Sequence, residues 1–79
     1  MRIKRPLTNL GNGDKYEGEW DELGRRDGKG IHYLRSGSRY EGYWKEDKRN
    51  GKGRLIFKTG DVYIAEWKDN KQHGDGKEF

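Results

Sequence analysis

Aromatic and polar side chains alternate along several short stretches of this chain. Tyr40, Gly42 and Trp44 have one parity, whereas Glu41 and Tyr43 have the other. Residues i, i+2 and i+4 of a β-strand point to one face of a sheet, so this period of two predicts a strand with an aromatic face and a second face. No stretch sustains the period of a helix, and glycine interrupts every window. The pattern therefore predicts an all-β fold.

Three copies of this stretch, each beginning with Tyr and ending with Trp, lie at residues 16–20, 40–44 and 63–67. A Gly-x-Gly follows each copy, at residues 28–30, 51–53 and 74–76. The first copy has one extra residue before its Gly-x-Gly, where a loop would tolerate it. A unit of this length has room for two strands of about six residues but not for a helical crossover. We therefore expect consecutive antiparallel β-hairpins in a single-layer, elongated sheet.

A loop over residues 45–50 that closes a regular hairpin would set the register of the second copy. It places Trp44 opposite Gly51 and Gly42 opposite Gly53, so that each indole lies over a residue without a side chain. On the second face, the same register pairs Glu41 with Arg54, Glu19 with Lys29, and Glu66 with Asp75. The last pair brings two acids together, so we expect the third hairpin to slip or fray.

The repeated pattern resembles the MORN repeat, whose core reads Tyr-Glu-Gly-x-Trp, then Gly-x-Gly, then Gly before the next Tyr. The resemblance covers residues 13–79, and the third copy departs from it because Ile64 replaces Glu and Ala65 replaces Gly. It implies a MORN-repeat sheet that works as a non-catalytic platform for scaffolding at membranes, cilia or the cytoskeleton.

The repeat boundaries follow from the glycine that precedes each Tyr by three residues. We expect a basic N-terminal segment and half-repeat cap at 1–12, repeat 1 at 13–36, repeat 2 at 37–59 and a truncated repeat 3 at 60–79, all in one array. Each end would expose the edge of a sheet, and an uncovered edge invites edge-to-edge pairing with another chain.

Two sets of side chains follow from strand parity. The structural aromatic stripe, which we expect to share a face with Leu55 and Phe57, contains Tyr16, Trp20, Tyr40, Trp44, Tyr63 and Trp67. The candidate partner face, on the opposite side, contains Ile31, Tyr33, Tyr43, Ile56 and Ile64. An exposed apolar patch in a single-layer sheet marks an interaction site, unless the stems of Lys52, Arg54 and Lys77 cover it.

Composition adds charge to this picture, with a net charge of +4 and 41% charged residues. Basic residues gather at equivalent hairpin ends, which makes Arg25, Arg26, Lys45, Lys48 and Arg49 candidate contacts to acidic phospholipids or phosphoinositides. Acidic residues in the same segments dilute this field, and a merely solvated surface is the alternative. Nucleic-acid binding is not expected, because the aromatic residues have a structural task in the hairpins.

No constellation for catalysis is present in the sequence. The two histidines, His32 and His73, lie far apart in the repeat scheme, cysteine is absent, and the carboxylates lack metal-ligand spacing. We expect no enzyme activity, no metal and no cofactor.

No apolar run approaches the ~18 residues of a membrane span. The sequence therefore favours an intracellular protein. The resemblance to the MORN repeat implies a place in the cytoplasm or cytoskeleton, with the cilium as one setting, and binding to other proteins of a larger cytoskeletal or ciliary (axonemal) assembly. Peripheral binding to an anionic membrane is the alternative.

Overall fold

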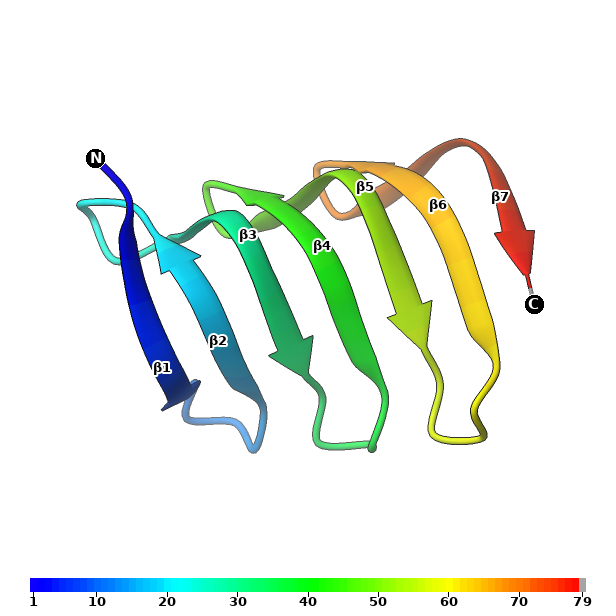
Figure 1. Ribbon diagram of the computed structural model, residues 1–79, viewed down its shortest axis with the longest axis horizontal. Coiled ribbons are helices and arrows are strands. Elements are labelled where there is room, and N and C mark those ends of the chain that lie inside the picture. The colour runs from blue at the N-terminus through cyan, green and yellow to red at the C-terminus, as the bar shows by residue number, and fades with distance from the viewer. Residues whose placement is uncertain (79) are drawn as a thin grey trace.

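Seven antiparallel strands make up the described part of the chain. The computed structural model describes the backbone of residues 1–78 and the side chains of residues 1–73. The strands are β1 (Ile3–Asn9), β2 (Lys15–Trp20), β3 (Arg26–Tyr33), β4 (Arg39–Lys45), β5 (Lys48–Ile56), β6 (Val62–Lys68) and β7 (Lys71–Glu78). They follow one another in chain order across one open sheet, which Figure 1 shows as a curved row of hairpins. This confirms the predicted all-β fold of consecutive hairpins in a single, elongated layer.

The hairpins at one end of the sheet differ in the length of their turns. Glu46 and Asp47 both have positive φ, at 49° and 70°, and Asp69 and Asn70 repeat this at 50° and 69°. Two consecutive residues with positive φ are the mark of a two-residue turn whose twist matches that of the flanking strands. Between β2 and β3 a five-residue loop over residues 21–25 replaces this turn. The extra residue of the first copy is therefore accommodated in that loop.

The predicted register holds in the middle of the second hairpin and fails near its turn. Gly42 pairs with Gly53, as expected, but Trp44 pairs with Arg49 rather than with Gly51. The reason is that the turn takes only two residues, so the strands continue further and a β-bulge absorbs the surplus residues on β5. Trp44 instead lies opposite Gly28 of the preceding hairpin.

Tyrosine rings, not indoles, cover the second glycine of the Gly-x-Gly within each of the first two hairpins. A Cβ added to Gly30 would overlap the Tyr16 hydroxyl, and one added to Gly53 would overlap the Tyr40 hydroxyl. The Tyr16 hydroxyl donates to the Glu19 carbonyl oxygen of its own strand at 2.9 Å. Glycine is required here because the phenol ring lies against the backbone of the neighbouring strand, in the space that a Cβ would fill.

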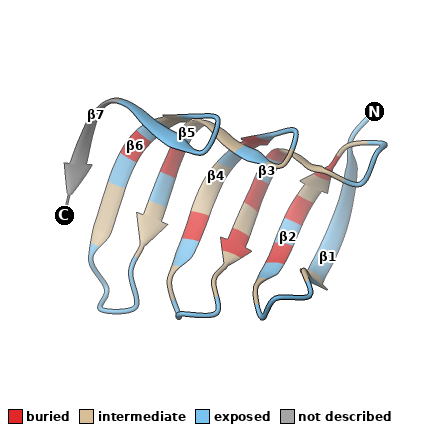
Figure 2. Cartoon of the chain, turned by 180° about the vertical axis from the view of Figure 1, so that it is seen from behind, coloured by how far each residue is buried: buried red, intermediate tan, exposed pale blue. Residues whose placement is uncertain are grey.

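The core is a line of edge-to-face aromatic rings on one side of the sheet. Tyr16, Trp20, Tyr40 and Trp44 form the buried cluster, and their neighbouring ring centroids lie 4.9–5.6 Å apart. Figure 2 shows the buried residues in red across the middle strands, while β1 is almost wholly exposed. Of the other residues expected on this face, Tyr63 is half-buried, and Trp67 and Leu55 pack partly buried against the cluster.

Phe57 does not join this core and is 40% exposed. The prediction was wrong because β5 ends at Ile56 and Phe57 belongs to the following turn, where its amide donates to the Asp61 carbonyl oxygen at 2.8 Å. Strand parity carries no information about a side chain once the strand has ended.

The bulges also determine which of the three charge pairs expected on the second face are formed. Glu41 lies opposite Arg54 and accepts a hydrogen bond from its guanidinium at 2.6 Å, which confirms that pair. The Glu19 carboxylate accepts from the backbone amide of Lys29 at 2.8 Å instead of facing its ammonium group across the ladder. Glu66 pairs with His73 and not with Asp75, so that prediction was wrong, because the bulge in the third hairpin shifts the register.

Candidate interaction surfaces

A row of glycines crosses the middle of the sheet and forms the floor of a groove on the second face. Gly18, Gly30, Gly42 and Gly53 are neighbours across successive strands. A Cβ on any of them would point to the aromatic face, toward the Tyr16 or Tyr40 hydroxyl. On the second face the glycines present only backbone, and the residues before and after them stand up as two parallel rows. The first row contains Glu17, Ile31, Glu41, Arg54 and Ile64, and the second contains Glu19, Lys29, Tyr43, Lys52 and Glu66. We call the space between them the glycine-floored groove.

One half of the glycine-floored groove is apolar. A hollow of about 510 Å³ lies over β3 to β6 and brings Ile31, Tyr43 and Ile64 together. Tyr43 is 50% exposed and Ile64 is 42% exposed, so both present apolar surface to the outside. Lys52 and Arg54 also line the hollow, and Tyr43 and Ile64 keep much of their surface exposed beside them. The side chain of Lys77, the third residue that was expected to cover this patch, lies outside the described residues.

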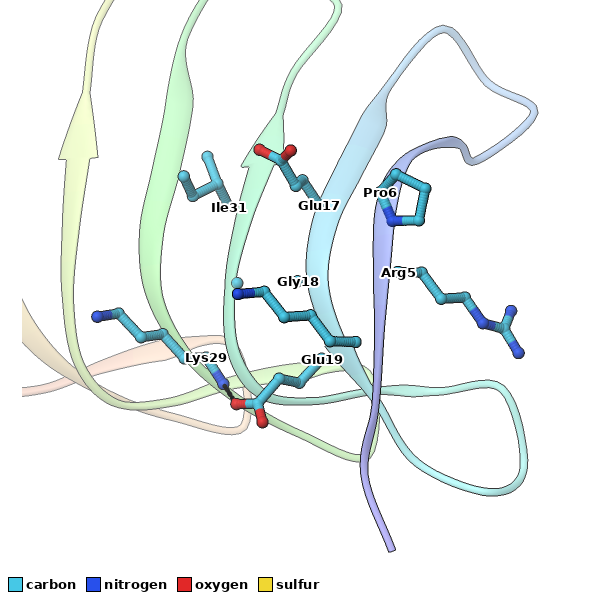
Figure 3. Close-up of a pocket in the computed structure, with 9 residues that line it drawn as sticks. Arg5, Pro6, Glu17, Gly18, Glu19, Lys29 and Ile31 are labelled. Atoms are coloured by element: carbon cyan, nitrogen blue, oxygen red, sulfur yellow. Dashed lines mark hydrogen bonds between the residues drawn. The ribbon is translucent and has the colours of Figure 1, made fainter.

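The other half of the groove lies over β1 to β3. Its hollow, of about 810 Å³, is lined by Lys4, Arg5, Pro6, Glu17, Gly18, Glu19, Lys29, Gly30 and Ile31. Figure 3 shows Glu17 and Ile31 on one side, the bonded pair Glu19 and Lys29 on the other, and Gly18 between them. The two hollows share Lys29, Gly30 and Ile31, so they form one continuous groove across the strands.

Two residues of the candidate partner face lie outside this groove. Tyr33 and Ile56 both pair with Arg39, which separates them in the next row along the strands. Tyr33 lines a different hollow of about 380 Å³ together with Leu7 and Leu34. Ile56 is half-buried. Parity assigned all five residues to one face, but only Ile31, Tyr43 and Ile64 are brought together.

The basic residues expected to form a lipid-binding edge are largely engaged within the protein. Arg25 pairs with Asp21 at 2.7 Å. The guanidinium of Arg26 lies 4.4 Å from the centroid of the Trp44 ring. The guanidinium of Arg49 lies 4.9 Å from the ring of Trp67 and 5.0 Å from that of Tyr40. Lys45 and Lys48 are exposed.

Stacking of arginine on the next repeat was not expected from the sequence. Arg26 stacks on Trp44, and Arg49 stacks on Trp67 in the equivalent manner. The sequence does contain a signal for this stacking, because each of the two tryptophans is preceded by an arginine at the same interval of 18 residues. Cation–π contacts of this kind contribute roughly 0.5–2 kcal/mol each. The arginines at the hairpin ends therefore connect successive repeats.

One buried imidazole lies on the aromatic face. His32 Nε2 lies 2.9 Å from Asp14 Oδ2. Burial lowers the pKa of His32, and the Asp14 carboxylate opposes that shift only in part. The pKa of Asp14 is lowered chiefly by the hydrogen bond that its carboxylate accepts from the Arg35 amide.

Among the described residues, no group of three His, Cys, Asp or Glu side chains could hold a metal ion. Nor does the described part contain a helix long and apolar enough to cross a membrane.

The spacing of the hairpins agrees with one known repeat family. The family model of the MORN repeat matches residues 16–39, 40–62 and 63–79. The chain belongs to the MORN repeat family. The three matched segments begin at the tyrosines, three residues after each expected boundary. MORN repeats are typically protein- or membrane-binding modules, and the family is generally non-catalytic. No curated protein matches the chain.

Proposed function

We propose that this chain is a non-catalytic module that binds a partner protein through the glycine-floored groove. The observation that carries the proposal is the pair Tyr43 and Ile64, which are 50% and 42% exposed and line one hollow with Ile31. An exposed apolar surface with a polar rim is typical of a protein-binding site, and tyrosine is one of the residues that anchor such interfaces.

The residues in this groove also depart from the charge pattern of the repeat. Ile64 stands where the first two copies have Glu17 and Glu41, and Tyr43 stands where the first copy has Glu19. Isoleucine and tyrosine favour strands, but at these exposed positions neither side chain is buried in the core. Binding of a partner that covers Tyr43 and Ile64 would account for their presence.

The wider setting that we propose is a larger cytoskeletal or ciliary (axonemal) assembly inside the cell. This part of the proposal is supported by family resemblance alone. A single-layer array of hairpins suits the role, because it presents two faces along its length and each repeat packs only against its neighbours.

Binding to anionic lipid receives less support from the contacts of the basic residues. Three of the five candidates, Arg25, Arg26 and Arg49, contact acids or aromatic rings of the chain itself. Sedimentation with vesicles that contain phosphatidylserine tests this alternative. Salt-sensitive binding that is lost in a Lys45→Gln, Lys48→Gln variant would favour the lipid role over the protein role.

Site-specific photo-crosslinking tests the protein-binding role in cells. A photoreactive phenylalanine analogue at position 43 should capture a discrete partner, whereas the same analogue at position 57 should not. Phe57 is a matched control because it is an aromatic residue that is 40% exposed but lies outside the groove. The captured partner is then purified and titrated against the unmodified chain. Equal capture from both positions, or no binding in the titration, would count against the groove as the interface.

A further inference from the structure

Two arginines on the aromatic side of the sheet have equivalent surroundings, 23 residues apart. The backbone amide of Arg26 donates to the Asp47 side chain at 2.7 Å, and that of Arg49 donates to the Asn70 side chain at 2.8 Å. Asp47 and Asn70 hold the same turn position, with φ of 70° and 69°. Each turn residue therefore binds the backbone of the arginine in the preceding hairpin.

The two sites differ in charge. The Asp47 carboxylate also pairs with the Arg26 guanidinium, with Oδ1 at 3.1 Å from Nε. The amide of Asn70 cannot supply a negative charge to Arg49, and no described side chain forms an ion pair with that guanidinium. Arg49 is half-buried between the rings of Tyr40 and Trp67. A cation withdrawn from water without a counterion is unfavourable.

A small hollow adjoins the Arg49 guanidinium. Its volume is about 210 Å³, and it is lined by Arg26, His32, Trp44, Arg49 and Asn70. None of these residues is acidic, and burial lowers the pKa of His32, which disfavours its charged form. Burial and the nearby charge of Arg26 likewise lower the pKa of Arg49. Because Arg26 already has Asp47 as its counterion, the hollow carries the charge of one guanidinium that no side chain of residues 1–73 compensates.

We propose that this hollow binds a carboxylate. A guanidinium that lies over an aromatic ring can keep N–H groups available, and their fork matches the two oxygens of a carboxylate. One positive charge without a counterion among the described residues suits a monoanion. The carboxylate comes either from a Glu or Asp side chain of an acidic peptide or from a small organic acid. This site lies on the opposite face from the glycine-floored groove, so it stands or fails independently of that proposal.

Nuclear magnetic resonance can follow the Arg49 side-chain Nε–H signal during titration at constant ionic strength. The probes are the blocked peptide Gly-Glu-Gly, its Gly-Gln-Gly counterpart, acetate and inorganic phosphate. The Glu peptide should shift the signal saturably, and the Gln peptide should not. Tighter binding of the Glu peptide than of acetate would identify a polypeptide as the source, and equal affinity would identify a small acid.

The decisive variant is Asn70→Asp, which copies Asp47 and gives Arg49 an internal counterion in the same turn geometry. It should weaken binding of the Glu peptide by roughly tenfold or more, because the guanidinium is then already paired. Lys48→Gln removes an exposed charge at the same end of the sheet and should leave the affinity unchanged. Undiminished binding by Asn70→Asp would overturn the site. Saturation by phosphate without saturation by the Glu peptide would overturn the carboxylate assignment.

Discussion

At the scale of single residues, a glycine on the neighbouring strand makes room for the ring of Tyr16 and for that of Tyr40. A Cβ at position 53 would overlap the Tyr40 hydroxyl and ring, and Tyr40 is fully buried, so the ring has little room to move. We expect Gly53→Ala to lower the free energy of unfolding by about 1–3 kcal/mol through overpacking. Urea denaturation measures the change, with Lys52→Ala as the control at an adjacent exposed position. Equal stability of the two variants would show that the close approach is not required.

The buried imidazole of His32 predicts a loss of stability in mild acid. Its pKa is lowered by burial from the ordinary value of 6.5, so below that pH the unfolded chain binds more protons than the folded chain. Its contribution is fully present above pH 6.5 and is lost as the pH falls below that value. The pKa of Asp14 is also lowered, but from 3.8, so its effect lies at more acidic pH.

Urea denaturation at several pH values between neutral and pH ~5 measures this dependence. The matched variant is His32→Leu, because Leu55 stands at the equivalent position in the next repeat. We expect the variant to have a flatter dependence on pH than the wild type over this interval. Parallel curves for the two proteins would assign the acid sensitivity to other groups.

At the scale of elements, each hairpin is bound to the next by the residues near its turn. Trp44 lies opposite Gly28 of the preceding hairpin, and its indole N–H donates to the Gly30 carbonyl oxygen at 3.3 Å. The same indole contacts the ring of Tyr16 in the first repeat and that of Tyr40 in its own repeat. Trp44 therefore contributes to the stability of two repeats at once.

Truncation of Trp44 should be more damaging than truncation of Trp67. Trp44 is 3% exposed in the central repeat, whereas Trp67 is only partly buried. We expect Trp44→Ala to lower the free energy of unfolding by about 3–5 kcal/mol, which is a large fraction of the total stability of a small domain. Trp67→Ala should lower it by less. Thermal and urea denaturation of the two variants check this order. A Trp44→Ala protein that melts within a few degrees of the wild type would contradict it.

The sequence predicted the hairpins correctly but not the bulges. Period-two parity and the repeated Gly-x-Gly specify strands, their antiparallel order and the pairing of Gly42 with Gly53. The turn length depends on whether Glu46 and Asp47 adopt positive φ, which is uncommon for residues other than glycine. Once the turn is short, the surplus residues must bulge, and the partner of Trp44 changes. The short turn therefore moved Trp44 away from Gly51, while Tyr40 kept its predicted partner Leu55.

The candidate surfaces were predictable only in part for the same reason. Parity alone assigned Tyr43 and Ile64 to the second face, but their closeness to Ile31 depends on the register of four strands. Arg26 and Arg49 were grouped as surface charges, because their contacts with Trp44 and Trp67 join different repeats. Such contacts appear only when the stacking of one hairpin on the next is known.

At the scale of the whole molecule, one layer of seven strands has to provide both a core and a surface for binding. The aromatic rings occupy one face, so the second face is left without a layer of protein to cover it within the described chain. The groove over the glycine row runs across the strands, so a partner seated in it would contact several repeats together. Protein binding by this face is the central claim.

The most direct test is the affinity of the doubly substituted chain Tyr43→Glu, Ile64→Glu for the partner captured from position 43. The substitutions place at both positions the residue type found there in other copies, so we expect the fold and the melting temperature to be retained. Isothermal titration calorimetry should show binding weakened by roughly a hundredfold or more if both are anchors of the interface. Phe57→Glu, outside the groove, should bind as the wild type does. A folded double variant that binds its partner with undiminished affinity would contradict the account.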